Sequence, residues 1–323
     1  MVRTVVVPLD GSQLAERALP YAVRLAQASA ARLVLMRAAL APPPQSLDGS
    51  DWEVLQSDAL AEATRYLLET ARSLSGQVSA VETIAPYGHA ADKIIETIQR
   101  YDADAVVMAT HGRTGFAHVL YGSVTESILS RSDVPVFAVY ARPGEKPLAP
   151  LTPEKARLLV PQDGSAYDAP ALQTALNMLG PGGEIVLMTV AEPPQHVERD
   201  ESGRRVLAYL DQQEEARTRE AREYLNSVLA ELRNQDVHVP VKVDVRLGDP
   251  VSGILMAAID SQADLIVMAT HGRTGIRRAV LGSVAGQVLR TGRTPVVLVH
   301  PTQAQLAEPP IERRQAVGPV PTF

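Results

Sequence analysis

Two short motifs in this sequence carry residue types that could hold a phosphorylated ligand, and each motif occurs twice. The first is Asp-Gly-Ser, at residues 10–12 and again at residues 163–165. The second is VMATHGRTG, at residues 107–115 and, unchanged, at residues 267–275. Glycine lets the backbone turn with positive φ and approach a ligand closely, because it has no Cβ. The repeated pair of motifs therefore indicates two copies of one kind of site.

A Gly-Ser pair follows each glycine loop, at the predicted start of a helix. These pairs are Gly122-Ser123 and Gly282-Ser283. Free backbone N–H groups and the helix dipole at such a start favour an anion such as phosphate. The alternative is that the glycines only make tight turns and the serines only cap helices. Near-identical loops in two diverged copies favour binding.

The glycine loops also carry a basic and a titratable side chain. Arg113 and Arg273 can pair with phosphate or lie solvated on the loop, and the sequence leaves both open. His111 and His271 have no carboxylate or nucleophile nearby at a recognised catalytic spacing. A loop histidine that bonds backbone is therefore the favoured interpretation, and no catalytic residue is assigned.

Other kinds of chemistry lack their signatures. There is no cysteine, which excludes disulfides, thiolate nucleophiles and cysteine metal sites, and no metal-binding motif is present. No Gly-Lys-Ser/Thr phosphate loop occurs, so an efficient ATPase is not indicated. The net charge of -6 argues against nucleic acid as the main partner.

The elements that must position the motifs alternate between strand and helix. Residues 12–30 have apolar side chains at helical spacing, and Pro20 is predicted to kink that helix. A long helix with a polar face is predicted over residues 51–74. The predicted strands are residues 4–9, 32–38, 78–85, 105–109 and 134–140 in the first half, and residues 157–161, 184–190, 239–247, 265–269 and 294–300 in the second.

Strands joined by helical crossovers form a parallel sheet with helices on both faces. The predicted fold class is therefore α/β, with two tandem doubly wound parallel-sheet domains. Ligands of such domains bind at the carboxyl ends of strands where the winding reverses. In each half one motif follows the first strand and the other follows the fourth, so they meet if those strands are neighbours.

The repeat also sets the predicted domain boundaries. Residues 1–141 form the first domain and residues 154–300 the second. Residues 142–153 are a proline-rich linker, and residues 301–323 are expected to be a poorly ordered tail. No apolar run approaches the roughly 18 residues of a membrane span, and the N-terminus enters a strand pattern without the features of a signal peptide. A cytoplasmic location is the default expectation.

The spacing of the motifs resembles that of the universal stress protein family. The family's ATP-binding signature is Gly, two residues, Gly, nine residues, Gly and then Ser or Thr. The pairs Gly112 with Gly122-Ser123 and Gly272 with Gly282-Ser283 match its second and third glycines. The resemblance covers nearly the whole chain and implies a Rossmann-like fold of the adenine nucleotide alpha hydrolase-like type.

Two departures from the family pattern bear on the ligand. Ala109 and Ala269 replace the first glycine, which adds a methyl group near the nucleotide position and weakens the ATP inference without cancelling it. Thr125 near the phosphates in the first copy corresponds to Ala285 in the second. The two sites are therefore expected to differ in affinity.

The resemblance also assigns roles at the other strand ends. It places Asp10 and Asp163 at the ribose and adenine end of ATP, whereas an aspartate there is more often a cap or an Asx turn. It places Ala38 and Val190 in the adenine pocket. The full set of candidate nucleotide-binding residues is Pro8, Asp10, Ala38, Ala109, Gly112, Arg113, Gly115, Gly122, Ser123, Val124 and Thr125 in the first copy, and Pro161, Asp163, Val190, Ala269, Gly272, Arg273, Gly275, Gly282, Ser283 and Val284 in the second.

The sequence thus predicts a stress-response protein that binds adenine nucleotide, ATP with or without Mg²⁺, in one or both domains and acts as a sensor or regulator. A slow nucleotide hydrolase or transferase, and a nucleotide-free interaction or chaperone-like scaffold, are the alternatives. The apolar final strands, residues 134–140 and 294–300, would lie at sheet edges. The resemblance implies that they pair, making an internal pseudo-dimer, and whole chains could associate further as a homodimer.

Overall fold

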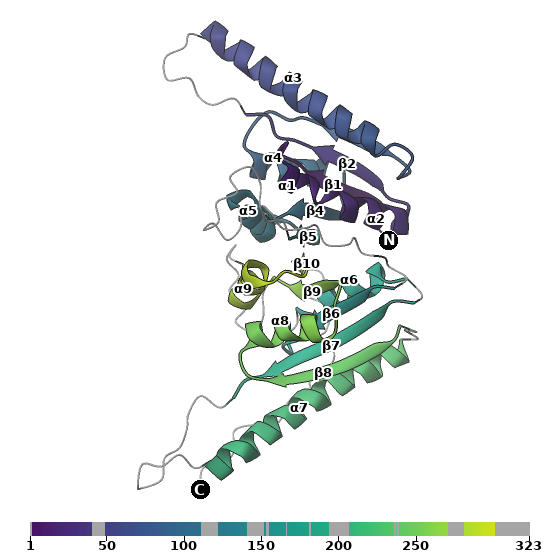
Figure 1. Cartoon of the computed structure of the whole chain (residues 1–323), viewed down its shortest axis with the longest axis vertical. Helices are drawn as coiled ribbons and strands as arrows, with labels where there is room; N and C mark the ends of the chain where they lie inside the picture. The colour runs from purple at the N-terminus through teal and green to yellow at the C-terminus, as the bar shows by residue number, and fades with distance from the viewer. Residues whose placement is uncertain are drawn as a thin grey trace.

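The computed structural model describes most of the chain, and the fold is stated for that part. The described residues are 2–40, 49–110, 122–140, 152, 155–165, 167–180, 182–193, 207–235, 237, 239–270 and 281–300. Within them, alternating strands and helices form one ten-stranded sheet with helices on both faces (Figure 1). No helix among these residues is long and apolar enough to cross a membrane.

The first half of the chain supplies five strands in the described residues. Its elements are β1 (Thr4–Pro8), α1 (Gln13–Glu16), α2 (Leu19–Ser29), β2 (Arg32–Met36), α3 (Gly49–Ser73), β3 (Val81–Ile84), α4 (Ala90–Arg100), β4 (Ala105–Ala109), α5 (Ser123–Arg131) and β5 (Val136–Val139). The second half repeats this order with β6 (Arg157–Pro161), α6 (Asp168–Met178), β7 (Glu184–Ala191), α7 (Leu207–Asn234), β8 (Val241–Leu247), α8 (Pro250–Asp260), β9 (Leu265–Ala269), α9 (Ser283–Thr291) and β10 (Val296–Val299).

The strand order confirms the predicted doubly wound arrangement in each half. The sheet runs β3-β2-β1-β4-β5 and then β10-β9-β6-β7-β8. Within each half every neighbouring pair of strands is parallel. The winding reverses between β1 and β4, and between β6 and β9, so the first and fourth strands of each half are neighbours. In each half this reversal brings the Asp-Gly-Ser turn next to the carboxyl end of the strand that begins the second motif.

The two halves join through their last strands. β5 and β10 pair antiparallel, with Val296 opposite Ala138 and Val297 opposite Phe137. Both strands are fully buried. Two apolar edges that would otherwise be exposed therefore cover each other.

Alternation of side chains along the strands divides the core between the two faces. On one face, Val5 and Leu33 pack with residues of α2 and α3, such as Ala22 and Leu67. The opposite face holds a second cluster that includes Val6 of β1 and residues of α4 and α5. Each cluster contains residues from both halves, so each layer of core continues across the whole sheet.

The helix predicted over residues 12–30 is two helices in the structure. α1 ends at Glu16 and α2 begins at Leu19, with Pro20 in the first turn of α2. Proline is tolerated there because its missing N–H would have no intrahelical partner. Thr152 apart, the predicted linker (142–153) and the predicted tail (301–323) lie outside the described residues. Both assignments, and the domain boundaries beside them, stay predictions.

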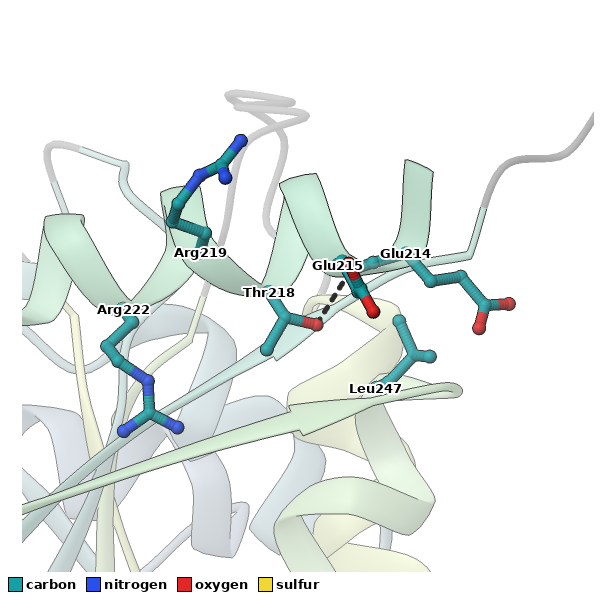
Figure 2. A pocket seen from close by; sticks show the side chains of 6 residues that line it. All are labelled: Glu214, Glu215, Thr218, Arg219, Arg222 and Leu247. Atoms are coloured by element: carbon teal, nitrogen blue, oxygen red, sulfur yellow. Dashed lines mark hydrogen bonds between the residues drawn. The ribbon is translucent and has the colours of Figure 1, made fainter. Parts of the chain in front are cut away.

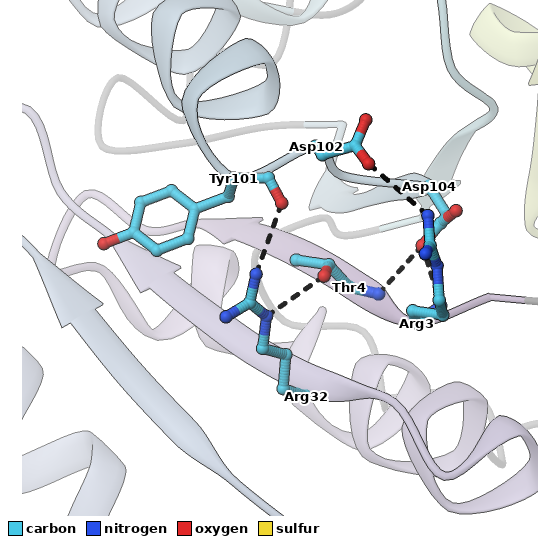
Figure 3. A network of polar contacts seen from close by, with 6 residues as sticks. All are labelled: Arg3, Thr4, Arg32, Tyr101, Asp102 and Asp104. Atoms are coloured by element: carbon cyan, nitrogen blue, oxygen red, sulfur yellow. Dashed lines mark hydrogen bonds and ion pairs between the residues drawn. The ribbon is translucent and has the colours of Figure 1, made fainter.

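Polar contacts link the strands of the first half at their amino ends, opposite the carboxyl ends that carry the motifs. Figure 3 shows Asp104, just before β4, accepting hydrogen bonds from the backbone N–H groups of Arg3 and Thr4, at 2.7 and 2.9 Å. Arg32 of β2 donates to the Thr4 hydroxyl at 3.1 Å and to the Tyr101 carbonyl at 3.4 Å. These bonds cross-link β1, β2 and the segment before β4, which supports the strands that carry the motifs.

Candidate functional site

The first Asp-Gly-Ser motif forms a tight turn at the carboxyl end of β1. The Asp10 carboxylate accepts hydrogen bonds from the Ser12 backbone N–H at 2.9 Å and the Ser12 hydroxyl at 2.6 Å. The Ser12 hydroxyl also accepts from the Ala15 N–H and caps α1. Gly11 has a φ of +84°, which explains the glycine. The Asx-turn interpretation of Asp10 is therefore confirmed, and the carboxylate lies half-buried at the reversal point.

The second motif forms the same turn after β6, with different support. The Ser165 N–H donates to Asp163 at 2.8 Å, and Gly164 has a φ of +78°. Here a second carboxylate, that of Asp168 at the start of α6, lies under the turn. It accepts from the Gly164 N–H at 2.7 Å and from the Asp163 N–H at 3.1 Å. The Asp168 carboxylate thus fixes the backbone of the second turn through hydrogen bonds.

In each half, the strand beside the one that ends in the motif turn is followed by a helix, and the start of that helix is bonded to the end of its strand. The N–H of Gly122 donates to the carbonyl of Thr110, just after β4, at 3.2 Å, and Gly282 donates to Thr270 at 2.8 Å. Gly122 and Gly282 are the N-cap residues of α5 and α9, and neither helix has a side-chain cap hydrogen bond. The alternative in which Ser123 and Ser283 act only as helix caps is therefore not what the structure shows. A helix start without a side-chain cap suits an anion.

The serines and their neighbours occupy distinct places on these helices. Ser123 and Ser283 are the first helical residues and are exposed, whereas Val124 and Val284 are half-buried. Thr125 is buried, and its hydroxyl is 3.5 Å from the Thr110 carbonyl oxygen. Among the residues that the structure describes, none lies within 4 Å of a Cβ built on Gly122.

The remaining candidates lie at the ends of strands along the same edges. Pro8 and Pro161 end β1 and β6, and Ala109 and Ala269 end β4 and β9. Ala38 follows β2, and Val190 lies near the end of β7. The structure therefore brings these residues to the strand ends that carry the turns. Other candidates lie outside the described residues, namely Gly112, Arg113, Gly115, Gly272, Arg273, Gly275 and the two loop histidines, His111 and His271.

An arginine that the sequence did not single out lies against the first turn. Arg37 directly follows β2, and its guanidinium would be 3.0 Å from a Cβ placed on Gly11. It pairs with Glu62 of α3 at 2.9 Å and lies over the Tyr66 ring, 5.1 Å from the centroid. The Arg37 side chain is 9% exposed and the Glu62 side chain 55%. The buried Arg37 side chain thus lies between the first turn and α3 and contacts both.

A tyrosine on each long helix reaches a carboxylate beside the turn. Tyr66 of α3 donates to Glu16 at 2.9 Å, and Tyr224 of α7 donates to Asp168 at 2.8 Å. Burial, and next the hydrogen bond to Glu16, raise the pKa of Tyr66. The repeated pattern Glu-Ala, two residues, Tyr-Leu, at residues 62–67 and 220–225, was the sequence signal for these tyrosines.

Asp168 is the most perturbed carboxyl group of the described part of the chain. It is 8% exposed, and burial followed by the nearby Asp163 charge raises its pKa from 3.8 to about 7. The hydrogen bonds from Tyr224, Asp163 and Gly164 oppose this shift because they stabilise the carboxylate. Asp168 therefore changes its charge near neutral pH.

The structure also differs between the halves at the predicted adenine end. Val190 packs so tightly against α8 that its Cγ2 is 2.6 Å from where a Cβ on Gly253 would lie. Gly88 and Gly248 precede α4 and α8 with positive φ, and five residues later the first half has Lys93 where the second has Gly253. The second half thus packs Val190 against a glycine of α8, whereas at the corresponding positions the first half has Ala38, after β2, and Lys93, on α4.

Shallow grooves lie along the long helices, beside the sheet. Figure 2 shows one of about 590 Å³ between α7 and the edge strand β8, lined by charged side chains of α7 and by Leu247. Within it the Thr218 hydroxyl donates to the Glu214 carbonyl at 2.8 Å. A second groove of about 390 Å³ is lined by α3 residues alone. Neither is lined by residues of the motif turns, so the candidate site is defined by its turns and helix starts.

The fold and the repeated turns define a tandem, doubly wound α/β protein, and comparison with known families makes this specific. The model of the universal stress protein family matches residues 1–139 and 156–300. The chain belongs to the universal stress protein family. The resemblance seen in the sequence is thereby confirmed.

Individual relatives agree with this membership. A universal stress protein of Mycobacterium tuberculosis is 29% identical over 200 residues, a match that spans 62% of this chain and 62% of that relative. Another, from Mycolicibacterium smegmatis, is 25% identical over 312 residues, covering 92% of this chain and 97% of the relative. The second match extends over both halves.

Solved structures share the tandem fold at low sequence identity. A universal stress protein from Archaeoglobus fulgidus aligns with a TM-score of 0.66 at 20% identity, covering 93% of this chain and 97% of that one. A putative universal stress protein from Pseudomonas aeruginosa aligns with a TM-score of 0.62 at 18% identity, covering 95% of each chain. These likenesses support the tandem α/β fold.

Proposed function

We propose that this protein binds an adenine nucleotide, ATP with or without Mg²⁺, in one or both halves and acts as a sensor or regulator in the stress response. The observation that carries the proposal is the placement, in each half, of an Asp-Gly turn beside a glycine-capped helix start on neighbouring strands. Such a reversal point is where doubly wound domains bind their ligands. Membership of the universal stress protein family supports the same conclusion.

The two ends of the ligand would meet different chemistry. The first-turn N–H groups of α5 and α9 would bind phosphate, and Asp10 and Asp163 would accept hydrogen bonds from ribose hydroxyls. Ala38 and Val190 would line the base end, and Mg²⁺ would accompany the phosphates. Through β5 and β10 the two domains, residues 1–141 and 154–300, would act as an internal pseudo-dimer in the cytoplasm.

Calorimetric titration of the full chain with ATP and Mg²⁺ tests the proposal. We expect binding at one or two sites, weakened about tenfold or more by Asp10→Ala in the first half and by Asp163→Ala in the second, because each loses a charge-assisted hydrogen bond. Asp102→Ala is the matched control: Asp102 is an exposed residue before β4 that pairs with Arg3 at 3.4 Å, and its loss should leave binding unchanged. No heat of binding, together with no nucleotide carried over in the purified protein, would contradict the proposal and favour a nucleotide-free scaffold.

A phosphate-release assay on the same samples separates binding from turnover. We expect binding with slow turnover at most, in keeping with a sequence that lacks the Gly-Lys-Ser/Thr loop. Rapid Mg²⁺-dependent release, abolished by His111→Ala together with His271→Ala, would instead identify a hydrolase.

A further inference from the structure

The buried charge behind the Asp-Gly turn has opposite sign in the two halves. In the first half it is the Arg37 guanidinium, which lies against Gly11. In the second it is the Asp168 carboxylate, which accepts hydrogen bonds from Asp163 and Gly164. Both side chains belong to residues less than a tenth exposed, and both touch the turn itself.

The two charges come from non-equivalent positions, so neither half contains both. Pro8 pairs with Met36 and Pro161 with Met188, which makes Thr189 the counterpart of Arg37. The motif spacing makes Ala15 the counterpart of Asp168. The first half therefore has a cation and a methyl group at these places, and the second has a hydroxyl and a carboxylate.

Within the part of the chain that the structure describes, the neighbouring side chains do not cancel this difference. Glu62 pairs with Arg37 from the solvent side, with 55% of its side chain exposed, so water screens the anion more than the cation. The titratable groups facing Asp168 are Asp163 in the turn and Tyr224 on α7. Among the described residues no Lys, Arg or His forms an ion pair with Asp168. The described side chains that contact Asp168 therefore add no positive charge to it, and Asp168 brings a negative charge to the second turn whenever it is ionised.

We propose that the two halves select nucleotides by charge: the first half, with Arg37 behind its turn, takes the triphosphate, and the second, with Asp168, takes less charged forms such as the monophosphate at neutral and higher pH. This rests on the proposed adenine-nucleotide function of the two sites. Arg37 and Asp168 act through the field at the turn, and neither needs to touch the ligand. At partly buried sites a unit charge several ångströms away changes affinity by about tenfold.

The second half should also respond to pH. Since the pKa of Asp168 is raised to about 7, its charge is present at pH 8 and largely lost at pH 6. ATP affinity of the second half therefore rises as pH falls from 8 to 6. The first half, measured under the same conditions, reports any contribution from titration of ATP itself.

Half-specific variants of the full chain test this inference. Asp163→Ala leaves the first half to be measured, and Asp10→Ala leaves the second. Because Mg²⁺ bound to ATP would reduce its charge to that of AMP, these titrations are made without Mg²⁺. We expect the ratio of ATP to AMP affinity at pH 8 to be about tenfold higher in the first half than in the second. Asp168→Asn, added to Asp10→Ala, should raise ATP affinity of the second half about tenfold at pH 8 and remove its pH dependence. Arg37→Thr, added to Asp163→Ala, should lower the ATP to AMP ratio of the first half.

Equal ATP to AMP ratios in the two halves, or no effect of Asp168→Asn, would overturn the inference while leaving the proposed function standing. If no adenine nucleotide binds, titration with inorganic tripolyphosphate tests charge selection separately from the proposed nucleotide function. Tighter tripolyphosphate binding to Asp168→Asn than to the wild-type chain at pH 8 would uphold charge selection and reject only the nucleotide function. No tripolyphosphate binding to either would reject both. Circular dichroism of each variant confirms folding.

Discussion

The two halves share their strands, turns and helix starts, yet they support the Asp-Gly turn in opposite ways. The first half uses Arg37, held between Glu62 and the Tyr66 ring of α3. The second uses Asp168, held by backbone N–H groups and Tyr224 of α7. In both, the long helix reaches the turn through a tyrosine. The backbone of the turn is thus the same in both halves, while the buried charge that supports it is positive in the first and, when Asp168 is ionised, negative in the second.

This difference implies unequal costs in folding. The buried Arg37 guanidinium has a partner of opposite charge in Glu62, although water screens part of their attraction because Glu62 is more than half exposed. A buried carboxylate beside another carboxylate is destabilised when ionised, as the raised pKa of Asp168 indicates. The second half therefore maintains a destabilising group at its turn, which is typical of functional sites rather than of packing.

The largest expected effect comes from neutralising that group. Because the folded-state pKa of Asp168 is about 7 and its ordinary value 3.8, the stabilisation from its bound proton is fully present below pH 3.8 and lost as pH rises through 7. Asp168→Asn should therefore raise the free energy of unfolding by about 2–3 kcal/mol at pH 8 and by much less at pH 5. Urea titrations at both pH values measure this, and a gain that is the same at both would contradict the assignment.

The next effect tests how tightly Val190 packs against Gly253 of α8. Gly253→Ala should destabilise the protein by about 1–3 kcal/mol, because the new Cβ would lie 2.6 Å from Val190 Cγ2. Lys93→Ala, at the corresponding place in the first half, should cost no more than about 0.5 kcal/mol. Thermal unfolding of the two variants makes the comparison. Equal losses of stability in the two variants would mean that α8 packs no more tightly than α4.

A smaller effect separates the two tyrosines. Tyr224→Phe removes a donor from the buried Asp168 and should cost about 1–2 kcal/mol at pH 8, with the pKa of Asp168 rising further. Tyr66→Phe removes a donor from the less buried Glu16 and should cost about 0.5–1 kcal/mol. Chemical denaturation at pH 8 ranks the pair. The reverse ranking would show that the Asp168 contact is not the stronger support.

Much of the fold was predictable because its signals are local. Buried parallel strands appear as short apolar runs, and the predicted runs at residues 105–109, 157–161 and 265–269 have the observed bounds. The helix predicted over residues 51–74 is observed at residues 49–73. The sequence predicts only a kink at Pro20, because it does not show that one helix ends at Glu16 and a second begins at Leu19.

The candidate site was predictable only where its residues form motifs. The Asp-Gly-Ser turns and Gly-Ser helix starts follow strands at fixed spacing, and the structure places them at neighbouring strand ends. Arg37 and Asp168 were missed because their importance arises from contacts with α3 and α7, which approach from far along the chain. In sequence, a lone arginine after a strand and an aspartate at a helix start have ordinary structural explanations.

The antiparallel pairing of β5 with β10 has a consequence for how such a protein can change over time. When two identical chains pair through one strand, every substitution appears twice, once on each side of the symmetry axis. Here both partners are encoded in one chain, so a substitution alters one side alone. Arg37 without a counterpart at Thr189, and Asp168 without one at Ala15, are differences that a symmetric pair of identical subunits could not contain.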